Sequence, residues 1–414
     1  MMLLSDAVTQ FALDMFRQFG KSKEDNIFFS PTNILSALGI LLLGSRGNTK
    51  LQILKVLHLT DGTENTTERV QADHVSPEHC SSEMVQKSEQ DIVLKVEKSG
   101  NVHHQFQKLL AELNKPTNAY ELKITSSLYV ENTFRFPEKF IDNIKKLDMV
   151  SVESVDFMKA PEESRKKINS QVEHQTNGKI RDLFPENSLN AATMVLANAG
   201  YFKGQWEEKF EEEKNYRGRI LAEQDCIIYI MYIYRECNFA LLEDVQAKAL
   251  EIPYKGKELS RIVLLPNEKD GLQKGKSCIH NPSSTKSKLD KEWTSSKNMR
   301  MTRVHLYLPR FRLEESYDLQ DTLKAMGMTD AFSARGADLS GMTGSRGLMV
   351  SKVLHKSLVE VTEEGVKAAS ATSMVISVTS SPIEEEFCCD HPFLFFIKQN
   401  KTNDILFLGR VSSP

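Results

Sequence analysis

The chain has 414 residues, 40% of them hydrophobic and 26% charged, a composition typical of a globular protein with a full hydrophobic core. Its formal net charge of −3 gives no electrostatic reason to expect a nucleic-acid partner or binding to an anionic membrane surface. The longest apolar runs, 34–43 and 227–234, are far shorter than the roughly 20 residues that span a bilayer. The first helical stretch lacks the positively charged start of a signal peptide, so we expect no membrane partner.

Helices and strands are expected in mixed order along the chain. Apolar residues at helical spacing predict a helix over 6–19, and Ser30-Pro31 opens a second helix that is apolar on nearly all sides over 34–43. Residues 61–100 are polar and charged without a sustained period, so we expect a long surface-loop insertion there. Further helices are expected at 160–177 and 317–326, and strands at 124–130, 193–202, 250–254, 261–265, 304–311, 350–361, 393–397 and 405–408. Because no regular strand–helix–strand rhythm is present, these elements predict a single mixed α+β domain over residues 1–414.

Motifs for metal sites and enzymes are weak in this sequence. The six cysteines form no CxxC pair and are expected to be free thiols, and His74, His79 and Cys80 lack a second ligand cluster with zinc spacing. The Gly275-Lys276-Ser277 run resembles part of a phosphate-binding loop, but Asp270 stands where that loop needs a glycine. GxSxG, HExxH and GxGxxG motifs are absent from the sequence. We therefore expect no metal, no cofactor and no catalytic residues.

The most informative segment runs from Glu363-Glu364-Gly365 to Ser373. Glycine can adopt backbone angles that other residues avoid, so Gly365 suits a hinge. Strand side chains alternate between two faces. If the segment became a strand, the residues on one face would be Val366, Ala368, Ser370 and Thr372. These side chains are small enough for a strand that slides between two others, but taken alone the segment is equally compatible with an ordinary Ala/Ser-rich surface loop.

The hinge segment resembles that of inhibitory serpins, and other motifs support this resemblance in the expected chain order. They are Asn26-Ile27-Phe28-Phe29-Ser30-Pro31, the stretch 196–206 ending at Trp206, 337–342 with His355-Lys356, 390–397 and 405–410. The chain is identified as a member of the serpin family. Its short N-terminus and Ser-Ser-Pro ending resemble the ovalbumin-type branch, and 100–106, 162–169 and 242–248 look most like the squamous cell carcinoma antigens.

The resemblance implies a serpin fold, with about eight or nine helices around three β-sheets and an exposed reactive-centre loop. The hinge and this loop would occupy residues 363–386. It also implies a suicide inhibitor rather than an enzyme: a protease attacks the loop and forms an acyl-enzyme, and the cleaved loop then inserts into the main sheet. The alternative is a non-inhibitory serpin or binding protein whose loop is cleaved as a substrate. For either, the resemblance implies a cytoplasmic monomer, with non-classical release as a further route to the extracellular space.

In serpins the cleaved bond lies fourteen residues after the hinge glycine, which places it at Thr379–Ser380, with Ser380–Ser381 as the neighbouring alternative. The loop has no Lys or Arg between Ala368 and Glu386, which disfavours a trypsin-like target. Thr379 would suit an elastase-like or chymotrypsin-like serine protease, and Val378 before it would suit a papain-like cathepsin. The sequence leaves these target classes open.

The resemblance also assigns two polar sites around the main sheet. A shutter, where strands part for the loop, would contain Ser30, Asn33, Asn198 and His355, with Asn33 in place of the usual serine. A breach at the top of the sheet would contain Trp206, Arg310 and Glu363. Residues 211–236 and 275–289 depart from the family pattern, so we leave open whether inhibition survives these segments.

Overall fold

The structure is a computed structural model, which describes residues 4–22, 25–59, 104–105, 107–113, 115–147, 151–220, 226–272, 298–365 and 384–413. The named helices are α1 (Leu4–Ser22), α2 (Pro31–Gly44), α3 (Gly47–Val56), α5 (Glu138–Leu147), α6 (Pro161–Gln175), α9 (Gln320–Ala325) and α10 (Ser340–Thr343), with short 3₁₀ turns η1 (Glu212–Lys214) and η4 (Asp330–Phe332). None of the helices in these ranges is both long and apolar enough to cross a membrane.

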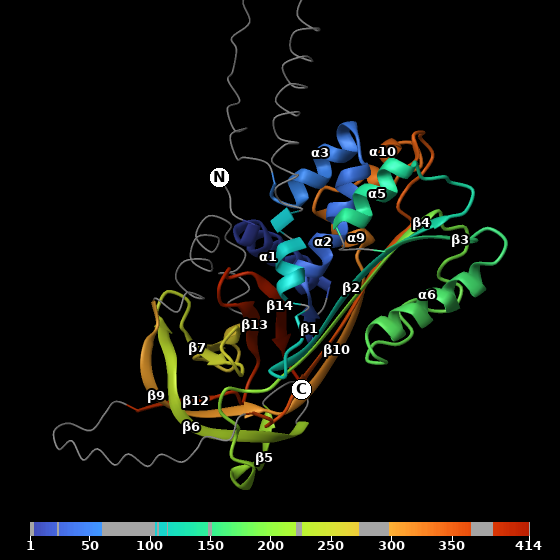
Figure 1. Cartoon of the computed structure of the whole chain (residues 1–414). Helices are drawn as coiled ribbons and strands as arrows, with labels where there is room; N and C mark the ends of the chain where they lie inside the picture. The colour runs from blue at the N-terminus through green and yellow to red at the C-terminus, as the bar shows by residue number, and fades with distance from the viewer. Residues whose placement is uncertain are drawn as a thin grey trace, which may run out of the picture.

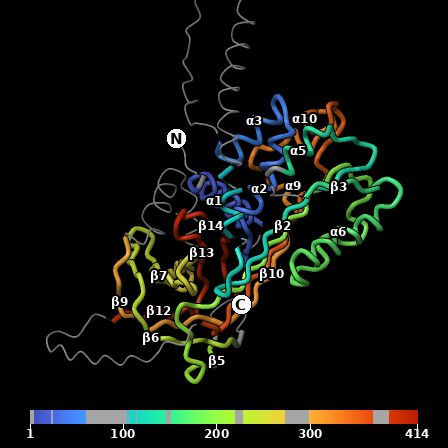
Figure 2. The backbone as a smooth tube through the Cα atoms, in the orientation of Figure 1, coloured from blue at the N-terminus to red at the C-terminus, as the bar shows by residue number. Residues whose placement is uncertain are grey.

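A five-stranded sheet forms the central layer. Its strands, in spatial order, are β10 (Phe311–Asp318), β11 (Lys352–Val361), β4 (Met194–Gly204), β2 (Tyr120–Glu131) and β3 (Ser151–Val155). Figure 2 shows β2 and β10 as long strands that follow the same slanted course. The central pair, β11 and β4, is parallel, whereas each of these strands is antiparallel to its outer neighbour.

The second sheet has nine strands and curves around the other end of the molecule. Its strands are β1 (Ile27–Phe29), β14 (Ile405–Val411), β13 (Phe393–Gln399), β8 (Leu259–Pro266), β7 (Ala247–Pro253), β6 (Cys226–Leu242), β9 (Arg300–Pro309) and β12 (Glu384–Cys388), with β5 (Tyr216–Ile220) paired to β6. The mixed α+β fold expected from the sequence is confirmed. Within the described residues the strands form two continuous sheets rather than three, because the 17-residue β6 pairs with β5, β7 and β9 along its length.

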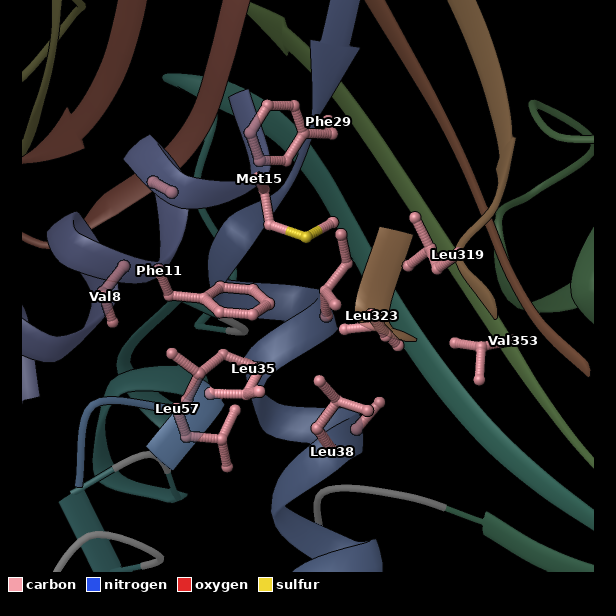
Figure 3. Close-up of a cluster of buried hydrophobic side chains, with 14 of the residues drawn as sticks. Val8, Phe11, Met15, Phe29, Leu35, Leu38, Leu57, Leu319, Leu323 and Val353 are labelled. Atoms are coloured by element: carbon pink, nitrogen blue, oxygen red, sulfur yellow. The ribbon is translucent and has the colours of Figure 1, made fainter. Parts of the chain in front are cut away.

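Apolar side chains cover both faces of the five-stranded sheet. On one face, Ile168 and Val172 of α6 pack on alternate residues of β4, such as Val195 and Ala197. On the other face lie α1, α2 and α9, and Figure 1 shows α6 and these helices on opposite sides of the strands. Figure 3 shows side chains from α1, α2, α9 and β11 meeting in the core of that second layer: Val8, Phe11, Met15, Leu35, Leu38, Leu323 and Val353.

The boundary between β10 and α9 differs from the sequence expectation. The helix expected at 317–326 begins only at Gln320, because β10 continues in register with β11 to Asp318. Tyr317 is held in that strand by stacking on Phe19 at 4.1 Å, and its hydroxyl accepts a bond from the Phe28 amide. The divergent segment 211–236 forms η1, β5 and the first part of β6 wherever the structure describes it. The segments 61–100 and 275–289 lie outside the described residues.

Candidate functional site

The hinge follows directly from the end of β11. Three hydrogen bonds tie its backbone to the stretch after β4. The Trp206 indole Nε1 donates to the Thr362 carbonyl at 2.7 Å, and the Trp206 amide donates to the Glu364 carbonyl at 2.9 Å. The Phe210 amide donates to the Glu363 carbonyl at 3.2 Å. Trp206 is itself buried and stacked on Tyr254, so the hinge is fastened to a rigid anchor.

The three predicted breach residues come together at this hinge. The Arg310 guanidinium lies 3.7 Å from the buried Glu363 carboxylate, and the Asn215 side-chain amide donates to the same carboxylate at 2.9 Å. Because Arg310 is more than half exposed, its ion pair contributes at most about 1 kcal/mol. Asn215 was missed in the sequence. It lies in the segment that departs from the family pattern, so no motif indicated it.

Gly365 is required for a different reason than the sequence suggested. Its φ angle lies outside the left-handed region, so no unusual backbone angle is used in this state. Instead, Gly365 pairs with Trp206 in an isolated bridge. A Cβ atom there would lie 2.8 Å from the Trp206 carbonyl oxygen and 2.9 Å from the Lys209 backbone. Close approach of two backbones therefore explains the glycine.

The predicted shutter residues form a buried cluster where α2 meets the sheets. Ser30 caps α2 by accepting a bond from the Asn33 amide at 3.2 Å, and its hydroxyl donates to the Leu406 carbonyl at 2.7 Å. The Ser30 amide donates to His355 Nε2 at 3.0 Å. These bonds link α2, β14 and β11 and bring three of the predicted shutter residues, Ser30, Asn33 and His355, into one cluster.

Asn33, in place of the usual serine, connects two further strands. Its side-chain amide donates to the Ala199 carbonyl in β4 at 3.0 Å, and its oxygen accepts from the Ser126 hydroxyl in β2 at 2.6 Å. The longer side chain therefore reaches two strands at once. Ser126 was also missed, although the polar run Thr125-Ser126-Ser127 directly before the apolar residues 128–130 of the strand was a usable signal.

His355 and Asn198 lie opposite each other across the β11–β4 pair. Burial lowers the pKa of His355 to about 3, so its imidazole is neutral at physiological pH. Nε2 accepts the Ser30 bond, while His355 Nδ1 and Asn198 Oδ1 have no hydrogen-bond partner among the described residues. Each unpaired buried polar atom costs about 1–3 kcal/mol. Among the described residues, the β11–β4 pair therefore carries two polar atoms without a partner, His355 Nδ1 and Asn198 Oδ1.

The β11–β4 pair also has a topology suited to insertion. Nine parallel register pairs run from Lys352–Val195 to Glu360–Lys203. A segment that folds back from the hinge would run antiparallel to both strands and could pair with each of them. The other predicted residues of the hinge and reactive bond lie outside the described residues: Val366, Ala368, Ser370, Thr372, Val378, Thr379 and Ser380.

Comparison with known proteins agrees with this geometry. The family described as Serpin (serine protease inhibitor) matches residues 6–414. The chain belongs to the serpin family. Human Serpin B4 and Serpin B3, the squamous cell carcinoma antigens, are each 57% identical to it, with 99% of both chains covered. The leukocyte elastase inhibitor of Equus caballus is 40% identical with 99% coverage of both chains. The solved structure of uncleaved ovalbumin superposes with a TM-score of 0.82 at 32% identity, covering 99% of this chain and all of that one.

These matches confirm the ovalbumin-type serpin predicted from the sequence. The protein is a protease inhibitor rather than an enzyme, and its partners are target proteases.

Proposed function

We propose that the protein inhibits elastase-like or chymotrypsin-like serine proteases, or papain-like cathepsins, through cleavage at Thr379–Ser380. The residues after the hinge then insert between β11 and β4. The observation that carries this proposal is the parallel β11–β4 pair, because the reactive segment continues from β11 through the hinge. The roles of the shutter and breach residues belong to the same proposal.

Insertion is favourable on hydrogen-bond count. The nine-pair parallel ladder between β11 and β4 would be replaced by two antiparallel ladders of about the same length. Roughly nine extra backbone bonds at about 0.5–1.5 kcal/mol each give a net gain on the order of 10 kcal/mol. Loss of the three hinge bonds offsets only a few kcal/mol of this. Burial of the small side chains at 366, 368, 370 and 372 adds to the gain.

Target class depends on the residues around the cut. Thr379 is small and β-branched and suits a shallow serine-protease pocket, whereas Val378 suits proteases that read the residue before the bond. We also propose a cytoplasmic monomer with release by a non-classical route, which rests on the ovalbumin-type relatives. Size-exclusion chromatography and fractionation of expressing cells test these last points.

The decisive experiment incubates the wild-type protein with a panel of the three protease classes. We expect near-stoichiometric inhibition and, with a serine protease, a covalent complex that survives SDS. If every protease in the panel cleaved the loop and none was inhibited, the proposal would be refuted and the protein would be a substrate-like serpin.

A matched pair of variants tests the insertion step. Val366→Arg should convert the inhibitor into a substrate, because a guanidinium on the inner face would be buried without a partner at a cost of several kcal/mol. Lys367→Glu, on the outer face, should change little. Thr379→Arg should redirect the loop to trypsin-like proteases and leave insertion intact. Equal inhibition by Val366→Arg and wild type would show that Val366 does not lie on the inner face of the inserted strand.

A further inference from the structure

The outer face of β6 carries aromatic rings outside the main core, where Tyr307 packs over the small buried cluster of Ile228 and Ile230. The inner residues Met231 and Ile233 are buried against Leu306 and other apolar side chains. On the opposite face, Tyr232 pairs with Tyr307 and Tyr234 pairs with His305 in the neighbouring β9. An antiparallel sheet with one face in solvent ordinarily alternates to polar side chains there. This strand includes the aliphatic–tyrosine run 227–234 that departs from the family pattern, and the inhibitory mechanism gives it no role.

The rings form one continuous surface, which we call the tyrosine face. Tyr232 and Tyr307 have ring centroids 5.0 Å apart, Tyr234 and His305 4.6 Å, and Tyr216 of β5 reaches Tyr307 at 6.2 Å. Tyr216 and Tyr234 remain 45% and 39% exposed. Contiguous exposed aromatic side chains are typical of protein-binding surfaces, because tyrosine offers apolar area and a polar tip on a rigid side chain.

One end of the tyrosine face is acidic and held in place. The Tyr234 hydroxyl donates to Glu384 at the start of β12 at 2.7 Å, and His305 Nε2 lies 3.5 Å from the same carboxylate. The Tyr234 bond and the His305 contact lower the pKa of Glu384 and keep it ionised. Glu385 and Glu386 follow it in β12. The rings therefore border the ionised carboxylate of Glu384, with exposed Glu386 two residues further along β12, whereas Glu385 is ion-paired with Lys248 at 3.9 Å.

Chain length places this face close to the reactive bond. Ser380 is four residues from Glu384, and an extended chain spans at most about 3.3–3.6 Å per residue, so the bond lies within roughly 15 Å of Glu384. A standard protein interface covers about 800 Å² on each partner, which corresponds to a disc with a radius of about 16 Å. A protease that attacks Thr379–Ser380 therefore covers Glu384 at the start of β12. Tyr234 is hydrogen-bonded to Glu384, so the protease also reaches the tyrosine face.

We propose that the tyrosine face is a secondary docking surface for the target protease, which contacts the rings with an apolar patch and Glu384–Glu386 with Lys or Arg residues beside its active site. The proposal rests on the proposed function, because it uses the same protease and the same reactive bond. The tyrosine face would then be a second determinant of which protease is inhibited, in addition to the sequence of the loop.

The test compares association rates. Tyr234→Ala and the double variant Tyr232→Ala/Tyr234→Ala are incubated with a protease that wild type inhibits. In parallel, the same protease cleaves a free peptide of residues 366–386, which contains the reactive bond but lacks the tyrosine face. We expect the association rate constant to fall about tenfold in the double variant, with an unchanged stoichiometry of inhibition. Leu51→Ala is the matched control, because Leu51 is 40% exposed and lies on α3 at the far end of the molecule (Figure 1). It should associate at the wild-type rate.

The charge component has its own variant. Glu386→Lys should associate with the protease more slowly than wild type does. Raising the salt concentration should reduce this difference in association rate, because exposed charges are screened. If the double variant melts at a lower temperature, Tyr234→Arg replaces it, since this ring is exposed.

Association rates equal to wild type in all face variants would overturn the docking proposal and leave the proposed function intact. If wild type is instead cleaved without inhibiting, kcat/KM for cleavage of the intact protein is compared among the same variants. A tenfold loss of kcat/KM would support the tyrosine face as a docking surface although the inhibitory proposal had failed. An unchanged kcat/KM would refute the docking proposal as well.

Discussion

Arg261 is an arginine placed in the apolar core. It lies in β8, where every residue is buried, and its side chain is fully inaccessible to solvent. The guanidinium faces the rings of Phe395, Trp206 and Phe311 at 4.7, 5.4 and 5.8 Å. Its Nε donates to the Tyr254 hydroxyl at 3.0 Å, but Nη1 and Nη2 have no partner among the described residues. Burial accordingly lowers the pKa of this group.

The magnitudes favour removal of this charge. The two unsatisfied nitrogens cost at least about 2–6 kcal/mol in total, and the three cation–π contacts return about 1.5–6 kcal/mol, so the desolvation of the charge itself decides the balance. Replacing buried ionic groups with well-packed apolar residues often stabilises a protein by about 1–4 kcal/mol. Methionine is unbranched and adaptable enough to fill the same space. Arg261→Met should therefore raise the free energy of unfolding by about 1–4 kcal/mol.

Thermal denaturation measures the effect. An unfolding entropy of about 2.1 cal/mol/K per residue means that 1 kcal/mol shifts Tm by about 1 °C in a chain of 414 residues, so we expect a rise of about 1–4 °C. Arg261→Met/Tyr254→Phe removes the hydroxyl that would lose its donor, and should rise at least as far. A lower Tm in both variants would show that the rings and Tyr254 compensate the guanidinium, and would refute the reasoning.

Two further predictions concern the sheet. Because the pKa of His355 is lower in the folded state than in the unfolded chain, its contribution to stability is fully present above pH 6.5 and is lost as the pH falls toward 3. The free energy of unfolding should drop by about 2 kcal/mol more between pH 6.5 and 4.5 in wild type than in His355→Gln, measured by denaturant titration, and equal slopes would contradict this. Cutting the loop near Thr379 should raise Tm sharply because the freed strand can enter the sheet, and an unchanged Tm after confirmed cleavage would show that it cannot.

The sequence predicted the fold, and the predicted shutter and breach residues that the structure describes lie close together, for reasons that differ between the two sites. Ser30 bonds to a carbonyl 376 residues away, a contact that periodicity cannot reveal, so only the ordered family motifs brought the shutter together. Asn215 and Arg261 lie outside those motifs, and their partners depend on tertiary packing. The α9 boundary was misplaced because Tyr317 fits a helical apolar pattern, yet ring stacking and strand register hold it in β10. Local patterns thus identify elements, whereas long-range contacts decide where they end.

The uncleaved state is held at both ends of the reactive segment, and the strength of each attachment decides what cleavage changes. At the hinge, three bonds to Trp206 and Phe210 contribute about 2–4 kcal/mol, less than the roughly 10 kcal/mol gained by insertion. They can delay insertion but cannot prevent it. At the other end, β12 pairs with β9 over five positions from Glu384 to Cys388 and buries Phe387. We expect this second attachment to persist until the chain is cut, because the strand pairing and the burial of Phe387 hold β12 on β9. We expect cleavage at Thr379 to remove that restraint and to leave only the weaker hinge bonds, so that a single cut releases the inserting strand.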